Sequence, residues 1–206
     1  MPTSVKIFVV DDDYFSRDGI CGLIRDAGWQ AEGFSSCEAF LAADRRAPNR
    51  CLVLDIHLPG MGGLELMGRL QDRADGVPII AVSGSSRISE AVKAMSLGVG
   101  DFIEKPVPGD RLIASLTRAL DQSRRADTAR AQQSAAQGRL DGLTARQAEV
   151  LGRVLNGEPS KNIAADLGIS QRTVENHRAA ILRRTGARSL PALARLAMRA
   201  DGAAQG

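Results

Sequence analysis

Groups that can do phosphate or metal chemistry follow the apolar runs in the first half of the chain. They are Asp11-Asp12-Asp13 after VKIFVV (5–10), Asp55 at the end of CLVLD (51–55), Ser83 at the end of PIIAVS (78–83) and Lys105 at the end of DFIEK (101–105). A carboxylate that is buried at the end of an apolar strand costs free energy unless a cation pairs with it or coordinates it. The pattern therefore predicts a cation beside Asp55.

Together these groups would form a site for a phosphoryl group. Carboxylate oxygens with open positions suit Mg²⁺, which keeps several waters and is usually shared with phosphate. A carboxylate can also act as a nucleophile and form an aspartyl phosphate. Lys105 would add positive charge beside the transferred group, and the Ser83 hydroxyl would donate a hydrogen bond to a phosphoryl oxygen.

The segments that must position these groups alternate between strand and helix patterns over residues 1–120. The strand-like runs are 5–10, 30–34, 51–55, 78–83 and 101–105, and apolar residues at helical spacing lie between and after them. Five strands alternating with five helices predict an α/β fold with a parallel sheet covered on both faces. Ligands bind beyond the carboxyl ends of the strands in such folds, which is where the candidate groups lie.

These residues carry a family resemblance. The Asp11-Asp12 pair, LDIHLPGMGGLEL (54–66), Ser83 and DFIEKP (101–106) resemble the receiver domain of two-component response regulators over about residues 4–120. The resemblance implies a flavodoxin-like doubly wound sheet of five parallel strands and a sensor histidine kinase as partner. It implies the following roles: Asp55 is the phosphoacceptor; Asp11, Asp12, Asp55 and the backbone carbonyl of His57 hold Mg²⁺; Lys105 contacts the phosphate; Ser83 and Phe102 form the switch pair.

The second half of the chain has a different pattern. Residues 121–139 contain no Leu, Ile, Val, Met or aromatic residue, so they predict a linker between a receiver at 1–120 and a second domain at 140–206. Their Ala, Gln and Arg favour helix, so part of the linker could extend the preceding helix. From Leu140 only helices are expected, with starts at Thr144, Ser160, Ser170 and Ser189.

Two of these helices, within about residues 160–180, form a helix-turn-helix pattern around Gly168-Ile169-Ser170. The second helix would enter a major groove, where Arg172 and Asn176 could contact guanine and adenine edges. Periodicity alone favours a small helical bundle with a solvated arginine face. The candidate DNA contacts are Ser160, Lys161, Ser170, Arg172, Thr173, Glu175, Asn176, Arg178, Ala179 and Arg183.

A second resemblance favours DNA binding. Residues 143–189 are similar to the LuxR-type DNA-binding domain, with one departure: Glu175 stands where many members have lysine. Placed after a receiver, this domain points to the NarL/FixJ group of transcriptional response regulators. It implies double-stranded DNA as a partner, a homodimer when phosphorylated, and RNA polymerase as a further candidate partner.

The sequence thus predicts a regulator of transcription whose dimerisation and DNA binding change when Asp55 accepts a phosphoryl group. It is expected not to be an enzyme beyond slow self-dephosphorylation. One alternative is a receiver that gates another protein. The other is an aspartyl-phosphate hydrolase, which would need an Asp-x-Asp sequence where His57 stands.

Composition agrees with a cytoplasmic protein that acts on a polyanion. Residues 1–120 carry a net charge of −3 and residues 121–206 a net charge of +6. Three widely spaced cysteines favour reduced thiols over disulfides or a zinc site. No run approaches the roughly 20 apolar residues of a membrane span, and the start of the chain lacks the pattern of a secretory signal.

Overall fold

The computed structural model describes residues 5–43, 47, 49–72, 76–85 and 87–202. The chain divides into two compact units, residues 1–126 and 127–206.

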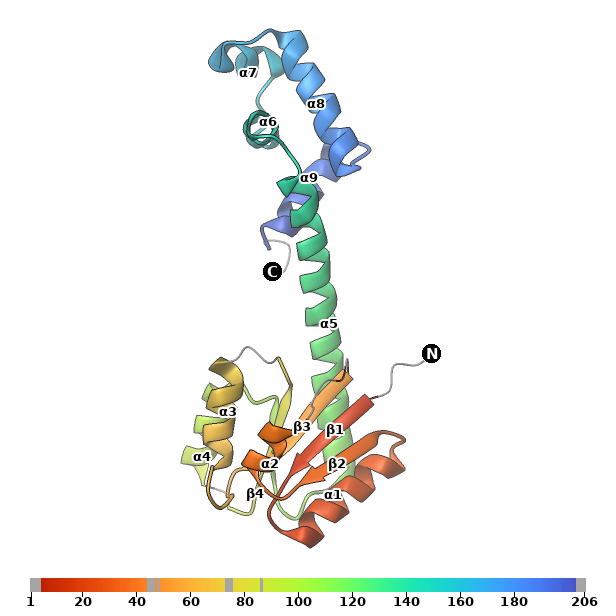
Figure 1. Cartoon of the computed structure of the whole chain (residues 1–206), viewed down its shortest axis with the longest axis vertical. Coiled ribbons are helices and arrows are strands. Elements are labelled where there is room, and N and C mark those ends of the chain that lie inside the picture. The colour runs from red at the N-terminus through yellow and green to blue at the C-terminus, as the bar shows by residue number, and fades with distance from the viewer. Residues whose placement is uncertain (1–4, 44–46, 48, 73–75, 86, 203–206) are drawn as a thin grey trace. The chain divides into compact units, whose positions relative to one another are not determined.

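The N-terminal unit is a doubly wound α/β fold, as predicted. Its five parallel strands lie in the order β2-β1-β3-β4-β5 (Figure 1), which is the flavodoxin-like order. The elements are β1 Val5–Val10, α1 Tyr14–Asp26, β2 Gln30–Phe34, α2 Cys37–Ala42, β3 Asn49–Asp55, α3 Gly63–Asp72, β4 Ile79–Ser83, α4 Ile88–Ser96, β5 Asp101–Glu104 and α5 Gly109–Asp141.

Alternate residues of the inner strands pack into two separate apolar layers, one on each face of the sheet. Ile7 and Val9 of β1 pack on one face with α1 and α5, whereas Phe8 and Val10 pack on the other face with α2, α3 and α4. This alternation follows from the period of two in a strand. Because both faces are covered, the central residues of the inner strands are apolar, and each fully buried large side chain contributes about 1.5–3 kcal/mol to stability.

The register of the sheet brings the candidate groups to one edge. Val10, the last residue of β1, pairs with Leu54, so Asp11 and Asp55 follow side by side. Asp55 pairs with Val82 of β4, and Ser83 pairs with Glu104 of β5, directly before Lys105. All four strands thus end at the same rim.

The last helix of the receiver pattern continues much further than its apolar residues. Helix α5 has 33 residues and includes all of 121–139, the segment expected to act as a linker. Within 121–139, Ala136 is the buried hydrophobic residue. The segment is helical because Ala, Gln and Arg have high helix propensity, although it has little to bury.

The C-terminal unit contains the four predicted helices, α6 Ala145–Leu155, α7 Ser160–Leu167, α8 Gln171–Thr185 and α9 Leu190–Ala200. Thr144 and Gln147 form the predicted capping box, and Ser170 and Ser189 cap α8 and α9. The expected cap at Ser160 is wrong by one residue: Pro159 occupies the N-cap position, and Ser160 is the first residue of α7. Its hydroxyl instead accepts a hydrogen bond from Arg178 Nη1 at 2.8 Å.

The helix-turn-helix geometry depends on Gly168 and on a small apolar core. Gly168 ends α7 in the left-handed region at φ 64°, which L side chains rarely adopt, so a glycine there allows the tight turn. The core that holds the helices together consists of Val150, Leu151, Val154, Ile163, Ala164, Val174, Ile181 and Leu193. Among the described helices, none combines the length and the apolar character required to cross a bilayer.

Gly63 allows α3 to begin directly against the end of β3. A Cβ atom at Gly63 would lie 2.3 Å from the carbonyl oxygen of Asp55 and 2.9 Å from Cα of Ile56. Both neighbours are backbone atoms, so they cannot move aside without shifting the strand end that carries Asp55.

We therefore expect Gly63→Ala to lower the free energy of unfolding of the N-terminal unit by about 1–3 kcal/mol through overpacking. Gly62→Ala is the matched control, because the nearest atom to a Cβ there is 4.0 Å away. Urea unfolding of both variants makes the comparison. Equal stability of the two variants would contradict this account of the turn.

Candidate functional site

Asp55 is buried and both of its carboxylate oxygens are hydrogen-bonded. The residue is 5% exposed at the end of β3. The backbone N–H of His57 donates to Oδ1 at 2.8 Å, and Lys105 Nζ donates to Oδ2 at 2.5 Å. Lys105, predicted to add positive charge beside Mg²⁺, is thus in contact with Asp55, and the two contacts hold the carboxylate in one orientation.

Asp11 shares the same lysine. It is 1% exposed, and Lys105 Nζ and Ser16 Oγ donate to its Oδ2 at 2.7 and 2.6 Å. The side chain of Arg17 donates to the backbone oxygen of Asp11 at 2.6 Å. Sequence reasoning missed Ser16 and Arg17. Their position in the first turn of the helix after an acidic strand end is the signal that would have found them, because that turn faces the rim.

Lys105 joins strand ends that are far apart in the sequence. Burial alone would lower the pKa of Lys105, but the hydrogen bonds and charges of Asp11 and Asp55 outweigh it and raise the pKa above its usual value. The lysine thus stays charged at neutral pH and offsets the repulsion between two carboxylates. The Lys105–Pro106 peptide bond is cis.

The three acids that were predicted to bind Mg²⁺ lie close enough to do so. One carboxylate oxygen each from Asp11, Asp12 and Asp55 lies within 4.8 Å of the others. Asp11 and Asp55 are buried and Asp12 is exposed, so the group opens to solvent on one side. An all-oxygen donor set with an open side fits Mg²⁺, which retains water ligands.

Ser83 and Phe102, the predicted switch pair, lie on adjacent strands. Ser83 is 0% exposed at the end of β4, and its Oγ lies 3.3 Å from His57 Nδ1. Ser83 Oγ also donates to the carbonyl of Ser85 at 3.0 Å. Phe102 of β5 is partly buried against the apolar layer that includes α4. Both residues therefore lie between the rim and α4.

Two exposed aromatic residues lie beside the acidic rim. Tyr14 and Phe15 begin α1 directly after Asp13 and are 62% and 83% exposed, with ring centroids 5.6 Å apart. Asp13 itself caps α1, since its carboxylate accepts from the N–H of Ser16 at 2.7 Å. Sequence reasoning missed this aromatic pair, although two adjacent large aromatics at a helix start are an unusual feature for a solvated surface.

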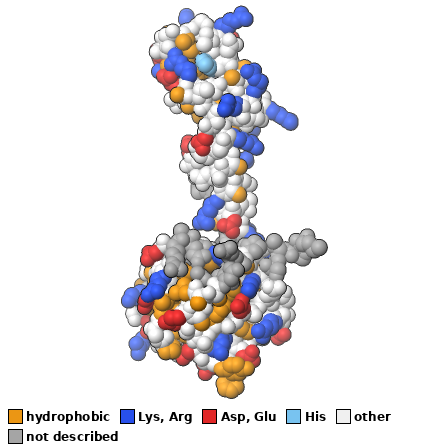
Figure 2. Space-filling model, viewed as in Figure 1, with side chains coloured by type: hydrophobic (Ala, Val, Ile, Leu, Met, Phe, Trp, Pro, Cys, Tyr) orange, Lys and Arg blue, Asp and Glu red, His pale blue; other side chains and the backbone are white. Residues whose placement is uncertain are grey.

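In the C-terminal unit, most predicted DNA contacts are exposed on α8 or at its start. The exposed ones are Lys161, Ser170, Arg172, Glu175, Asn176, Ala179 and Arg183, and the partly buried ones are Ser160, Thr173 and Arg178. Val174 and Ile181 of the same helix are buried in the core, which orients α8. Lys and Arg side chains are spread over the visible face of this unit (Figure 2).

Local hydrogen bonds hold several of these side chains. Ser170 Oγ accepts from the N–H of Thr173 at 3.1 Å and lies 2.8 Å from Thr173 Oγ1. Arg178 reaches Ser160 across the two helices of the motif. Gln171 Nε2 donates to Glu175 Oε1 at 3.4 Å, which partly satisfies the acid that departs from the LuxR-type pattern.

Comparison with known proteins agrees with this arrangement. Residues 7–117 match the response regulator receiver domain, and residues 141–197 match the luxR family of bacterial regulatory proteins. The chain belongs to the NarL/FixJ group of response regulators.

The similarity extends along nearly the whole chain. The transcriptional regulatory protein FixJ of Azorhizobium caulinodans is 38% identical over 202 residues, which cover 96% of this chain and 94% of that protein. The solved structure of the response regulator StyR is 35% identical, with a TM-score of 0.84 over 95% of this chain and 99% of that one. Full-length FixJ from B. japonicum is 36% identical, with a TM-score of 0.60 and coverages of 97% and 98%.

A response regulator of this kind joins a receiver to a LuxR-type DNA-binding domain and fits phosphorylation-gated control of transcription. Receiver domains generally bind Mg²⁺ at an acidic pocket like the one formed by Asp11, Asp12 and Asp55. The receiver implies a histidine kinase as partner, and the second domain implies DNA.

The shared lysine makes a prediction about stability. Lys105→Met should lower the free energy of unfolding at pH 8 by about 1–3 kcal/mol, because two buried carboxylates lose a charged hydrogen-bond donor. The contribution of Lys105 is fully present below its unfolded pKa of about 10.4 and is lost as the pH rises through the higher folded pKa. The two proteins should therefore converge in stability only above about pH 10. Urea unfolding across pH measures this difference.

Lys93→Met is the control for this prediction, because Lys93 is exposed on α4. It should remain within about 0.5 kcal/mol of the unmodified protein. If Lys105→Met were as stable as this control at pH 8, Lys105 would not hold the rim together.

Proposed function

We propose that Asp55 accepts a phosphoryl group from a sensor histidine kinase and that this modification changes dimerisation and sequence-specific DNA binding. The observation that carries the proposal is the buried Asp55 carboxylate, paired with Lys105 and grouped with Asp11 and Asp12 at one rim. A carboxylate held in this way is desolvated, oriented and next to positive charge, as a nucleophile for phosphoryl transfer requires.

In the transfer step, a carboxylate oxygen of Asp55 forms a bond to phosphorus while the bond from phosphorus to the donor's imidazole nitrogen breaks. Lys105 lies on the acceptor carboxylate and would offset negative charge on the transferred oxygens. Asp11, Asp12, Asp55 and the carbonyl of His57 would hold Mg²⁺, which would supply further positive charge to those oxygens.

The response to this charge involves Ser83, Phe102 and α4. The Ser83 hydroxyl would donate to a phosphoryl oxygen, and Phe102 would repack toward the space that Ser83 leaves. Helix α4 carries an exposed apolar stripe of Ile88, Val92 and Met95, which are 81%, 63% and 51% exposed. This stripe and β5 form the surface we propose for a homodimer. A shift from 1:99 to 99:1 needs about 5.5 kcal/mol of differential stabilisation.

Tyr14 and Phe15 are the residues we propose for contact with the kinase. They place two exposed aromatic rings next to Asp12 and Asp13, on the rim that a phosphohistidine must approach. Exposed aromatics provide large apolar contact area with little loss of side-chain entropy, so they are common in protein interfaces.

For DNA, we propose that α8 enters the major groove with Arg172, Glu175, Asn176, Ala179 and Arg183 toward the bases. Lys161, Ser170 and Thr173 would lie near the phosphates, while Ser160 and Arg178 would act as a joined pair at the start of α7. Glu175 would accept from a cytosine amino group or disfavour other bases. RNA polymerase is a further partner for a DNA-bound dimer.

The domain limits we propose are 1–120 for the receiver, 121–139 for a helical linker and 140–206 for the DNA-binding domain.

We also propose that the protein acts in the cytoplasm and is not an enzyme beyond slow self-dephosphorylation. The three cysteines are buried free thiols, and burial raises the pKa of Cys51 to about 12, so this thiol stays protonated and unreactive at neutral pH. His57 stands where a hydrolase of the Asp-x-Asp type needs its second acid, so regulation is favoured over turnover.

Incubation of the full chain with acetyl phosphate and Mg²⁺ should attach one phosphoryl group at Asp55, as intact and peptide mass spectrometry would detect. Asp55→Asn should remain unmodified, and chelation of Mg²⁺ should slow the reaction at least about tenfold. Asp13→Asn is the matched control, because this rim acid caps α1 and asparagine also caps helices well. An unmodified Asp55 alongside a phosphorylated neighbour would refute the proposed acceptor.

For DNA recognition, Asn176→Ala should weaken binding to a selected operator by about 1–3 kcal/mol while leaving non-specific binding nearly unchanged, because a base-edge contact carries the specificity. The measurement is fluorescence anisotropy on operator and scrambled duplexes at two salt concentrations. Arg199→Ala, an exposed charge loss on α9, is the control and should affect both duplexes alike. Equal weakening of both duplexes by Asn176→Ala would rule out base contact.

A further inference from the structure

The side chain of His57 connects two parts of the receiver that the proposed function uses. Its Nδ1 lies 3.3 Å from Ser83 Oγ, and its Nε2 lies 3.2 Å from Glu90 Oε1. Ser83 ends β4 at the rim, and Glu90 lies in the first turn of α4. The imidazole is therefore in contact with the switch hydroxyl on one side and with the helix of the apolar stripe on the other.

Glu90 is held in an unusual position for a surface helix. Its side chain is 17% exposed, and Oε2 is buried without a hydrogen-bond partner in the described part of the chain. Besides His57, Oε1 lies 3.7 Å from Arg87, whose own side chain is 74% exposed. A buried carboxylate oxygen without a hydrogen-bond partner costs free energy. The contact between Glu90 Oε1 and His57 therefore contributes much of the free energy that holds the Glu90 side chain in its buried position.

The two ring nitrogens of a neutral imidazole offer one donor and one acceptor. With the hydrogen on Nε2, the ring donates to Glu90, and its Nδ1 shares the hydrogen of the Ser83 hydroxyl with the carbonyl of Ser85, which lies 3.0 Å from Ser83 Oγ. That hydroxyl has one hydrogen, and a phosphoryl oxygen on Asp55 would compete for it as a charged and stronger acceptor. The backbone N–H of His57 already lies on Asp55 Oδ1, so the same residue touches the acceptor and both ends of the connection.

We propose that the imidazole of His57 is a positioning residue that links Ser83 to Glu90 of α4 in the unphosphorylated receiver, and that phosphorylation of Asp55 breaks the Ser83 side of this link. The link keeps the start of α4 in its resting position. Its loss frees Glu90 and the stripe of Ile88, Val92 and Met95. The second half of this inference rests on the proposed phosphorylation of Asp55, whereas the link itself does not.

The link can be tested without phosphorylation, by hydrogen exchange of the α4 amides in the full chain. His57→Ala should speed exchange at residues 88–96 by about 2- to 10-fold, the change expected for one lost hydrogen bond. Ser83→Ala should do the same, and the double variant should exceed neither single variant, because both remove one connection. Additive effects, or no effect of His57→Ala, would overturn the link.

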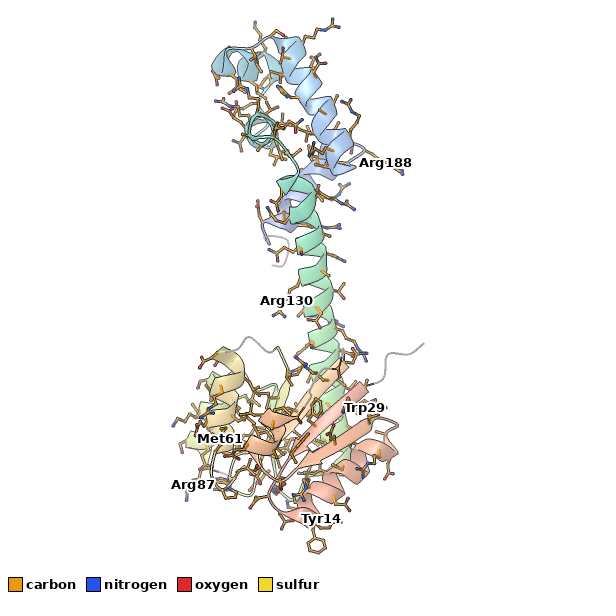
Figure 3. The ribbon with its side chains drawn as sticks, viewed as in Figure 1. Tyr14, Trp29, Met61, Arg87, Arg130 and Arg188 are labelled. Atoms are coloured by element: carbon orange, nitrogen blue, oxygen red, sulfur yellow. The ribbon has the colours of Figure 1, made fainter. Side chains whose placement is uncertain are left out.

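Arg87→Ala is the matched control. Arg87 Nη1 also lies 3.7 Å from Glu90 Oε1, but the Arg87 side chain is 74% exposed (Figure 3) and makes no side-chain cap hydrogen bond. Its loss should change exchange of α4 by less than about twofold. An effect as large as that of His57→Ala would show that any partner of Glu90 suffices, which would also overturn the link.

Acetyl phosphate and Mg²⁺ then test the release. The phosphorylated protein without substitutions should exchange its α4 amides as fast as unphosphorylated His57→Ala does. Phosphorylation of His57→Ala should speed this exchange by less than a further factor of about two. The ¹⁵N resonance of His57 Nδ1 should move on phosphorylation, and a resonance that stays in place on a chain phosphorylated at Asp55 would refute the release. Failure to phosphorylate Asp55 would instead refute the proposed function and leave the exchange test of the link standing.

Discussion

Lys105 holds two buried carboxylates together at the end of a parallel sheet, and the rest of the rim is built around that contact. Asp11 and Asp55 would repel each other at this separation, and both lie almost out of reach of water. One ammonium group satisfies both of them and keeps its charge because their combined effect outweighs its burial. The cost of desolvating three charges is met by hydrogen bonds from Ser16 and from the backbone of Asp13 and His57.

The charges of these residues also determine what else the site can bind. Three acids and one lysine carry a net negative charge, and an all-oxygen donor set with an open side at Asp12 fits a divalent cation such as Mg²⁺. The same crowding makes the site sensitive, because a phosphoryl group would add negative charge beside Asp11 and Asp55, whose carboxylates already share Lys105. The nearest groups able to respond are the Ser83 hydroxyl and, through His57, the start of α4.

The C-terminal unit is organised around the orientation of one helix, α8. A core of eight buried residues orients α8, and the hydrogen bond between Arg178 and Ser160 joins the two helices of the motif. The face of α8 that remains carries Arg172, Asn176 and Arg183 into solvent. Glu175 is the acidic residue among these side chains, and one of its carboxylate oxygens accepts a hydrogen bond from Gln171. The core and this hydrogen bond fix which face of α8 is exposed, and this is the face that we propose for DNA contact.

The amino-acid sequence was sufficient to predict the strands, the helix caps at Thr144, Ser170 and Ser189, and the identity of the rim residues. Period-two and period-3.6 apolar patterns and capping residues are local signals, and parallel strands must end at a common edge. The folded structure was needed to show which groups share Lys105, that Gly63 approaches the carbonyl of Asp55, and that Ser16 reaches Asp11. It also decided that His57 meets Glu90 of α4, 33 residues along the chain. Such contacts depend on side-chain directions and on the register of separate strands, and no periodic pattern in a single chain records either one.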